Sequence, residues 1–428
     1  MVILEVTRNR RHYLEMAIQT GTRSNMHMAS RTLLAFALAS PMLVIPTVFA
    51  QDRFRPSNNT VVLKSAISSQ TPGGESFKVA DAAWRAEPQN IQAATAYARS
   101  VFILGLNEGD LRWYGSAKAA LLPWWQDSKI PADTLFMRGL VKQGFHEFEA
   151  GLKDIDLAIA QNPQKAEFWS WRFALNLLRS DLKAAEKDCQ QIEVYFGRSE
   201  AMLHRAVLQS RTGQTELAIR TLKEILQNAA FAKQTDLEWV HFQLGEAYRV
   251  AGQYPLAIAV WKKQLTATPQ SHLIRLSLAE LLNQQGLFAE AQKVSAIDTP
   301  SDALLVQALL ANRGLKDKTE VKLAQLIEAR LATQALRNER LIERPKLIYL
   351  IDYGKDPVAG LQLSIDNWQL QQEPRDAVLF VKAALLTQQA PSAQPVLAWA
   401  EKTKYTDPQL AALLLQLKDK LQSRGLAP

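Results

Sequence analysis

The sequence EWVHFQLGEAYRVAGQYPLAIAVWKKQLTATPQS, at residues 238–271, carries the clearest pattern in this chain of 428 residues. Its apolar residues recur at spacings of three and four, which is the period of an amphipathic helix. Gly252 divides the stretch into two helical halves, and Pro269 stops the second half. Gly245 and Ala257 are small enough to let the two helices approach closely. The stretch therefore predicts a helix-turn-helix unit.

The same unit recurs along the chain with a period of about 34 residues. In each copy a small residue marks the turn, and an alanine follows five residues later. The pairs are Ser180 and Ala185, Gly213 and Ala218, Gly252 and Ala257, and Gly286 and Ala291. Five extra residues, around 228–236, separate the unit at 199–232 from the next one.

This pattern resembles the tetratricopeptide repeat (TPR) family. The match is strongest at 238–271, moderate at 199–232 and 272–305, and weak at 132–165 and 166–198. The resemblance implies an all-α fold, a right-handed superhelical solenoid of antiparallel helix pairs. We expect this TPR-like solenoid to cover residues 77–428, with its best repeats at 166–305.

The flanks of the repeats also predict helices. The expected ranges are 90–107, 110–126, 357–372, 374–388, 391–403 and 408–422, with one long helix or two within 316–340. Residues 408–422 carry an apolar leucine face and a charged face, so we expect a capping helix there. Helix boundaries within 306–345 are not predicted.

The first fifty residues read as a targeting segment. Residues 33–50 contain no charge, follow Arg31 and end in a small residue, which is typical of a secretory signal. Two prolines within the run disfavour the alternative of a retained membrane anchor. We expect residues 1–50 to form the signal region, with translation starting at Met26 or Met28, and residues 51–76 to form a flexible tether.

The net charge and the cysteine content narrow the class of protein. The chain has a net charge of +8, three units of which lie in the first fifty residues. The remainder is too weakly basic to predict a nucleic-acid partner. A single cysteine excludes an intramolecular disulfide. Cys189 falls at an apolar helix position, so we expect it to pack as a small hydrophobe.

No catalytic constellation emerges from the sequence. The six histidines are scattered, and no phosphate loop or nucleophile elbow occurs. We therefore expect a protein that is not an enzyme and uses no cofactor, metal or small-molecule substrate.

The resemblance implies a binding surface on the concave side of the first helix of each repeat. The residues at the corresponding places are Trp239, Phe242, Glu246, Arg249, Leu273, Leu276, Glu280, Asn283 and Gln284. This mixture of apolar and oppositely charged side chains suits an extended peptide or protein segment.

Two functional hypotheses follow. The first is a non-enzymatic scaffold exported to the periplasm or beyond, in a Gram-negative bacterium, that binds other envelope proteins. It would associate with a membrane only if residues 33–50 stay uncleaved. The second is a periplasmic carbohydrate- or peptidoglycan-binding protein that uses exposed tryptophans, and the early cluster of Trp124, Trp125, Trp169 and Trp171 suggests it.

Overall fold

A computed structural model describes residues 73–232, 236–295, 301–337, 343–423 and 425. The predicted signal region, both candidate start methionines and residues 51–72 of the tether lie outside the described residues. Helix α2 begins at Gly74, inside the last part of the predicted tether. None of the described helices has the length and apolar character needed to span a membrane.

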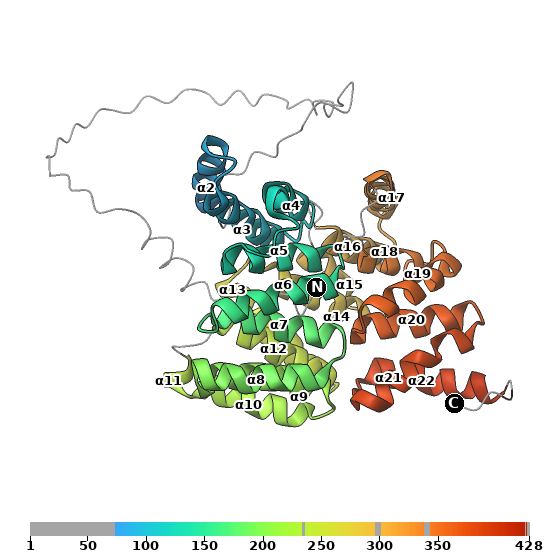
Figure 1. The fold of residues 1–428 in the computed structure, drawn as a ribbon. Helices are drawn as coiled ribbons and strands as arrows, with labels where there is room; N and C mark the ends of the chain where they lie inside the picture. The colour runs from blue at the N-terminus through green and yellow to red at the C-terminus, as the bar shows by residue number, and fades with distance from the viewer. Residues whose placement is uncertain (1–72, 233–235, 296–300, 338–342, 424, 426–428) are drawn as a thin grey trace, which may run out of the picture. The chain divides into compact units, whose positions relative to one another are not determined.

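Every regular element in the described part of the chain is a helix (Figure 1). The α-helices are α2 (Gly74–Ala86), α3 (Ile91–Glu108), α4 (Trp113–Leu121), α5 (Ala132–Gly144), α6 (Phe148–Gln161), α7 (Ala166–Leu178), α8 (Leu182–Phe196), α9 (Arg198–Arg211), α10 (Thr215–Gln227), α11 (Ala229–Ala232), α12 (Leu237–Val250), α13 (Tyr254–Ala267), α14 (His272–Gln284), α15 (Phe288–Ser295), α16 (Asp302–Leu315), α17 (Thr319–Arg337), α18 (Glu343–Ile351), α19 (Pro357–Leu370), α20 (Pro374–Leu386), α21 (Gln394–Thr403) and α22 (Pro408–Gln422). Two short 3₁₀ helices, η1 (Leu122–Trp124) and η2 (Ala390–Ala393), complete the set. The five extra residues predicted around 228–236 coincide in part with the short helix α11.

The turn within each helix pair has one recurring backbone feature, a residue with positive φ. These residues are Gly109, His146, Ser180, Gly213, Gly252, Gly286, Lys316, Gly354 and Gln388. The last two lie 34 residues apart, so the repeat continues to α20 and α21, well beyond the last unit found from the sequence. The predicted all-α, TPR-like solenoid of antiparallel helix pairs is confirmed.

Close packing within a pair explains the small residues in the repeat. The Trp261 side chain is fully buried, and its indole N–H donates a hydrogen bond to the carbonyl oxygen of Phe242 (3.2 Å). A Cβ atom added at Gly245 would overlap that indole. A small residue in the first helix is therefore required wherever a large side chain from the second helix crosses it.

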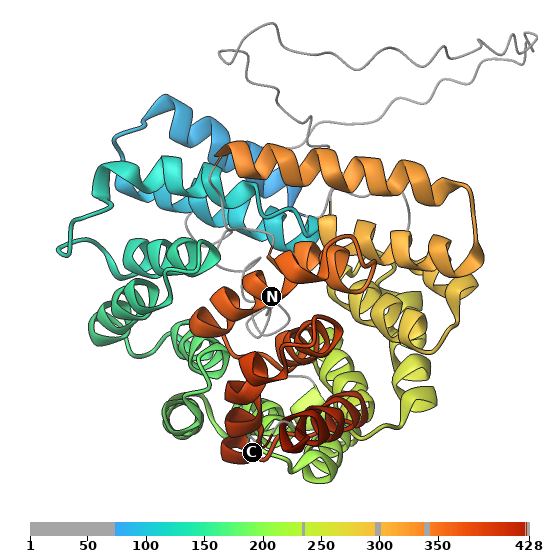
Figure 2. The same cartoon turned by 90° about the vertical axis from the view of Figure 1, so that its right-hand side faces the viewer.

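The last helix pairs lie inside the curve formed by the earlier ones. Figure 2 shows α20 to α22 (red) surrounded by the green and yellow helices, and side-chain contacts described below join them. The earlier helices also meet one another after a turn of the solenoid: a Cβ atom at Gly109, between α3 and α4, would overlap the ring of His272 at the start of α14.

The buried apolar residues form two main clusters. One runs from α2 to α15 along the curved part of the chain and also includes Ala311 of α16. The other joins α16 to α22 and includes only Val250 from the earlier helices. Where the C-terminal helices meet the curved part, the contacts are thus mainly polar.

The single cysteine and the tryptophans can now be located. Cys189 is fully buried, as predicted for a small hydrophobe, and burial raises the pKa of its thiol. Trp169 and Trp171 of the early tryptophan cluster are both buried, because α7 packs against neighbouring helices on several sides. None of the ten tryptophans is fully exposed, and Trp124 and Trp125 are half-buried.

Candidate binding face

Four of the nine predicted binding residues lie in the packing between helices. Trp239 and Phe242 are buried and stack on each other, with 5.1 Å between ring centroids. Leu273 and Leu276 are buried too, and Leu276 packs against α16. Packing between adjacent repeats buries these four side chains, so they present no surface to a partner.

The other five predicted residues face the inner side of the curve. We call the first helices α7, α9, α12 and α14, with the turns that follow them, the inner face. Glu246 and Arg249 lie one helical turn apart on α12, and Arg249 Nε donates a hydrogen bond to Glu246 Oε2 (3.2 Å). Glu280, Asn283 and Gln284 follow on α14.

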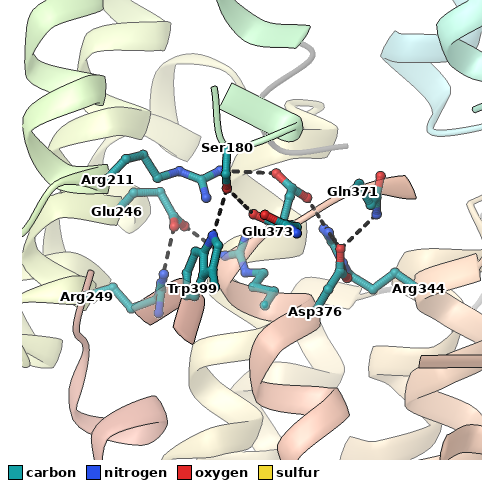
Figure 3. Close-up of polar contacts among 11 residues, drawn as sticks. Ser180, Arg211, Glu246, Arg249, Arg344, Gln371, Glu373, Asp376 and Trp399 are labelled. Carbon is teal, nitrogen blue, oxygen red and sulfur yellow. Dashed lines mark hydrogen bonds and ion pairs between the residues drawn. The ribbon is translucent and has the colours of Figure 1, made fainter. Parts of the chain in front are cut away.

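Residues from the C-terminal helices contact the inner face directly (Figure 3). Arg375 on α20 donates a hydrogen bond to Glu246 Oε1 (2.8 Å) and forms an ion pair with Glu280 (2.9 Å). It also reaches the hydroxyl of Ser277 (3.2 Å). Two of the predicted binding residues are therefore already engaged by the chain itself.

A second group of charges lies beside the first. Glu373, just before α20, forms ion pairs with Arg211 (3.2 Å) and with Arg344. Arg344 also binds Asp376 in a bidentate pair, with distances of 2.7 and 2.9 Å. Together these contacts join α9, α18 and α20.

The carboxylate of Asp407 completes the set. It lies 3.7 Å from Arg249, accepts a hydrogen bond from the Tyr405 hydroxyl (2.9 Å) and caps the start of α22. We use the name inner charge network for these nine residues: Arg211, Arg249, Arg344, Arg375, Glu246, Glu280, Glu373, Asp376 and Asp407.

At Glu246 and Arg249, pairing within the network outweighs burial. Burial alone would raise the pKa of Glu246, but Arg375 and Arg249 together hold its pKa below the ordinary value. Burial would likewise lower the pKa of Arg249, yet Glu246 and other neighbours raise it well above the ordinary value. Both groups stay charged, and removal of one partner would leave a buried charge unpaired.

The turns of successive repeats also touch the C-terminal residues. The hydroxyl of Ser180 accepts a hydrogen bond from the Trp399 indole (2.7 Å). A Cβ atom at Gly213 would overlap the carbonyl oxygen of Lys404, and one at Gly252 would lie 2.9 Å from Pro408 Cγ. We call these three turns, at 180, 213 and 252, the docked turns. The next turn in the series, at Gly286, has no heavy atom within 4 Å of such a Cβ.

An open cavity of about 580 Å³ continues the inner face beyond the docked turns. Its lining includes four of the predicted residues, Arg249, Glu280, Asn283 and Gln284. The opposite wall comes from α16, α18 and α20 and contains Leu310, Ile348, Val378 and Leu379. The open cavity thus combines polar groups on α14 with an apolar wall.

Two of its polar groups have unused binding capacity. The side-chain amide of Asn283 donates to the main-chain oxygen and to Oε1 of Gln307 (2.9 and 3.0 Å). Asn283 Oδ1 is buried and accepts no hydrogen bond from the described residues. Arg313 stacks over the Tyr353 ring and donates a hydrogen bond to the Tyr353 main-chain oxygen, and among the described residues it pairs with no carboxylate. A ligand could therefore donate a hydrogen bond to Asn283 and place an acidic group near Arg313.

The described residues contain no group of three or more His, Cys, Asp or Glu side chains placed to hold a metal ion.

Three members of the inner charge network at the start of α20, Glu373, Arg375 and Asp376, were not predicted from the sequence. They belong to no clear repeat place, and their partners lie far away in the chain, 129 residues in the case of Arg375 and Glu246. Only the charged run after Pro374 could have drawn attention to them.

No protein-family model matches the sequence, and no curated protein sequence matches it. Solved structures similar to the chain include a tetratricopeptide repeat protein from Parabacteroides merdae, with 19% identity and a TM-score of 0.39, covering 55% of this chain and 90% of that one. The human IFIT1 dimer with PPP-AAAA has 13% identity and a TM-score of 0.42, covering 77% of this chain and 76% of that one. Yeast Tom70 has 11% identity and a TM-score of 0.37, covering 81% and 85%. The likeness is to the TPR-like fold.

Proposed function

We propose that this protein is an exported, non-enzymatic binding protein of the cell envelope, and that its open cavity holds a peptide segment of another envelope protein. The observation that carries the proposal is the cavity of about 580 Å³ on the inner face, lined by Glu280, Asn283 and Gln284. Its volume falls within the range of ordinary ligand sites.

The chemistry of the lining supports a peptide ligand. The unpaired Oδ1 of Asn283 needs a hydrogen-bond donor, and a peptide main chain offers an N–H at every residue. The apolar wall at Leu310, Ile348 and Val378 accepts an apolar side chain. Arg313 near the mouth favours an acidic residue in the same segment.

Export is proposed from the uncharged run at residues 33–50. If the signal is cleaved after Ala50, the exported chain begins at Gln51. N-terminal sequencing of the protein isolated from its source cells tests this. A chain that keeps residues 33–50 and fractionates with membranes would show a retained anchor.

Site-specific crosslinking tests the cavity. A photoreactive amino acid at Gln284, which lines the cavity, should form an adduct with a defined envelope protein in source cells. Gln285 is the matched control, because it is an adjacent exposed glutamine outside the cavity lining. We expect the adduct at 284 and not at 285.

A blocking variant links the adduct to the cavity. Leu310 is a half-buried residue of the apolar wall, and Leu310→Trp should fill part of the cavity. The adduct at 284 should then disappear while the helical circular dichroism of the protein stays unchanged. Equal adducts at 284 and 285, or an adduct that persists in the folded Leu310→Trp variant, would contradict the proposed site.

A further inference from the structure

Residues 371–373, between α19 and α20, cross the inner face as an extended segment. The main chain has φ −140° and ψ 144° at Gln371, and φ −96° and ψ 147° at Glu373. Both side chains are buried. Extended backbone with buried side chains is the conformation in which a groove holds a peptide ligand.

The turn after α7 binds the main chain of this segment. The N–H of Gln372 donates to the carbonyl oxygen of Leu178 (2.8 Å), and the hydroxyl of Ser180 donates to the carbonyl oxygen of Gln372 (3.3 Å). One donor and one acceptor of the same residue are thus satisfied by the inner face. These contacts involve no side chain of the segment, so they would fit any extended residue at this position.

The flanking side chains supply the selectivity. Glu373 meets Arg211, and two residues later Arg375 meets Glu246 and Glu280. A segment without the acidic residue would leave Arg211 short of a partner. One without the basic residue would leave Glu280 without its partner and Glu246 with Arg249 alone. Each unpaired buried charge is costly.

The junction is polar, so a different segment could replace this one without uncovering a large apolar core. The two main hydrophobic clusters are separate, and the inner charge network lies where α20 meets the curved helices. A segment of the same chemistry would re-form the same ion pairs.

We propose that the inner face between the α7 turn and α14 is a second binding surface, specific for an extended segment with an acidic residue followed two positions later by a basic one. The chain's own residues 371–376 occupy this surface, and a partner segment of the same charge pattern binds by displacing them. The surface borders the open cavity, and Glu280 and Arg375 line both. Its contacts at Leu178, Ser180 and Arg211 lie outside the cavity lining, so binding of the segment can be tested separately from binding in the cavity.

The test uses a fluorescein-labelled synthetic peptide of residues 369–377, QLQQEPRDA, added to the full-length protein. Wild-type protein should bind it weakly, because an attached segment competes at an effective concentration in the millimolar range. In the variant Arg375→Glu the attached segment is repelled by Glu246 and Glu280, while the receptor residues remain intact. The peptide should then bind at least tenfold more tightly, as measured by fluorescence anisotropy.

Arg99→Glu is the matched control variant, because Arg99 forms a similarly half-buried ion pair with Glu167, at the opposite end of α7 from the turn that binds residues 371–373. It should bind the peptide as weakly as the wild type. A control peptide with the residues corresponding to Glu373 and Arg375 exchanged should bind to none of the proteins. Hydrogen exchange at residues 371–376 should accelerate in Arg375→Glu and not in Arg99→Glu.

Should Arg375→Glu fail to fold, Arg375→Gln removes the same charge without introducing repulsion. Two results overturn the proposal: a folded Arg375 variant that binds the peptide no better than the wild type, or one that binds the charge-exchanged peptide equally well. Crosslinking at Gln284 reports on the open cavity separately.

Discussion

Three glycines at the same place in successive repeats allow the docking of the C-terminal residues to be measured. Gly213, Gly252 and Gly286 have φ values of +74°, +74° and +71°, and each follows the first helix of a pair. An alanine at any of them carries the same left-handed strain. The sites differ in what the new Cβ atom would meet: the carbonyl oxygen of Lys404, the ring of Pro408, and open space.

The expected destabilisation follows from these surroundings. Left-handed strain costs about 1–2 kcal/mol, and the loss of unfolded-state entropy returns about 0.4–1 kcal/mol of it. Gly286→Ala should therefore lower the free energy of unfolding by about 1 kcal/mol. Gly213→Ala adds overlap with a main-chain oxygen, which costs a further ~1–3 kcal/mol. Gly252→Ala should lie between the two, since the Pro408 ring can change its pucker.

Urea unfolding, followed by circular dichroism and by tryptophan fluorescence, measures the series. The order of destabilisation should be Gly213→Ala, then Gly252→Ala, then Gly286→Ala. Hydrogen exchange around Lys404 should accelerate in Gly213→Ala alone. If Gly213→Ala and Gly286→Ala are equally destabilising, the docked turns do not hold the C-terminal residues and the reasoning fails.

Three further predictions concern single residues. Cys189 should react with a thiol reagent only after unfolding, because burial both covers the thiol and raises its pKa; rapid reaction of the native protein in a labelling time course would contradict this. The lowered pKa of Glu246 means that its stabilising charge is fully present above the unfolded carboxyl pKa, ~4.3, and is lost as the pH falls through the lower folded value. Stability measured from about pH 6 to pH 3 should thus fall more steeply in the wild type than in Glu246→Gln, and parallel curves would rule this out. Trp261→Ala should lower the free energy of unfolding by ~3–5 kcal/mol, since the side chain is fully buried; a loss below about 1 kcal/mol in urea unfolding would show that the site collapses freely.

The repeat architecture was predictable because it depends on the spacing of residues that lie close together in the sequence. Gly252 and Gly286 mark turns with a positive φ, and the 34-residue separation between them reflects one helix pair. Two of the three later turns use Lys316 and Gln388, whose long side chains gave no sign of a turn. The sequence pattern therefore faded near residue 305 although the repeat itself continues.

The inner charge network could not be predicted in the same way. Glu246 and Glu280 were identified as inner-facing from their places in the repeat, but their partner Arg375 lies in a helix pair that had no recognisable phase. Periodicity reports which face of a helix is polar and says nothing about what covers it. The burial of Trp239 and Leu276 could not be predicted for the same reason, because it depends on how closely adjacent helix pairs pack.

The bond between Trp399 and Ser180 joins residues 219 positions apart, and this separation governs the order in which the protein is completed. Helix pairs that contact only their neighbours can form as soon as they leave the ribosome. The docked turns must wait for residues 372–408, which are synthesised after them. Until then, Arg211, Glu246 and Glu280 face water without their partners from the C-terminal helices. The inner face can consequently close only after residue 408 has been synthesised.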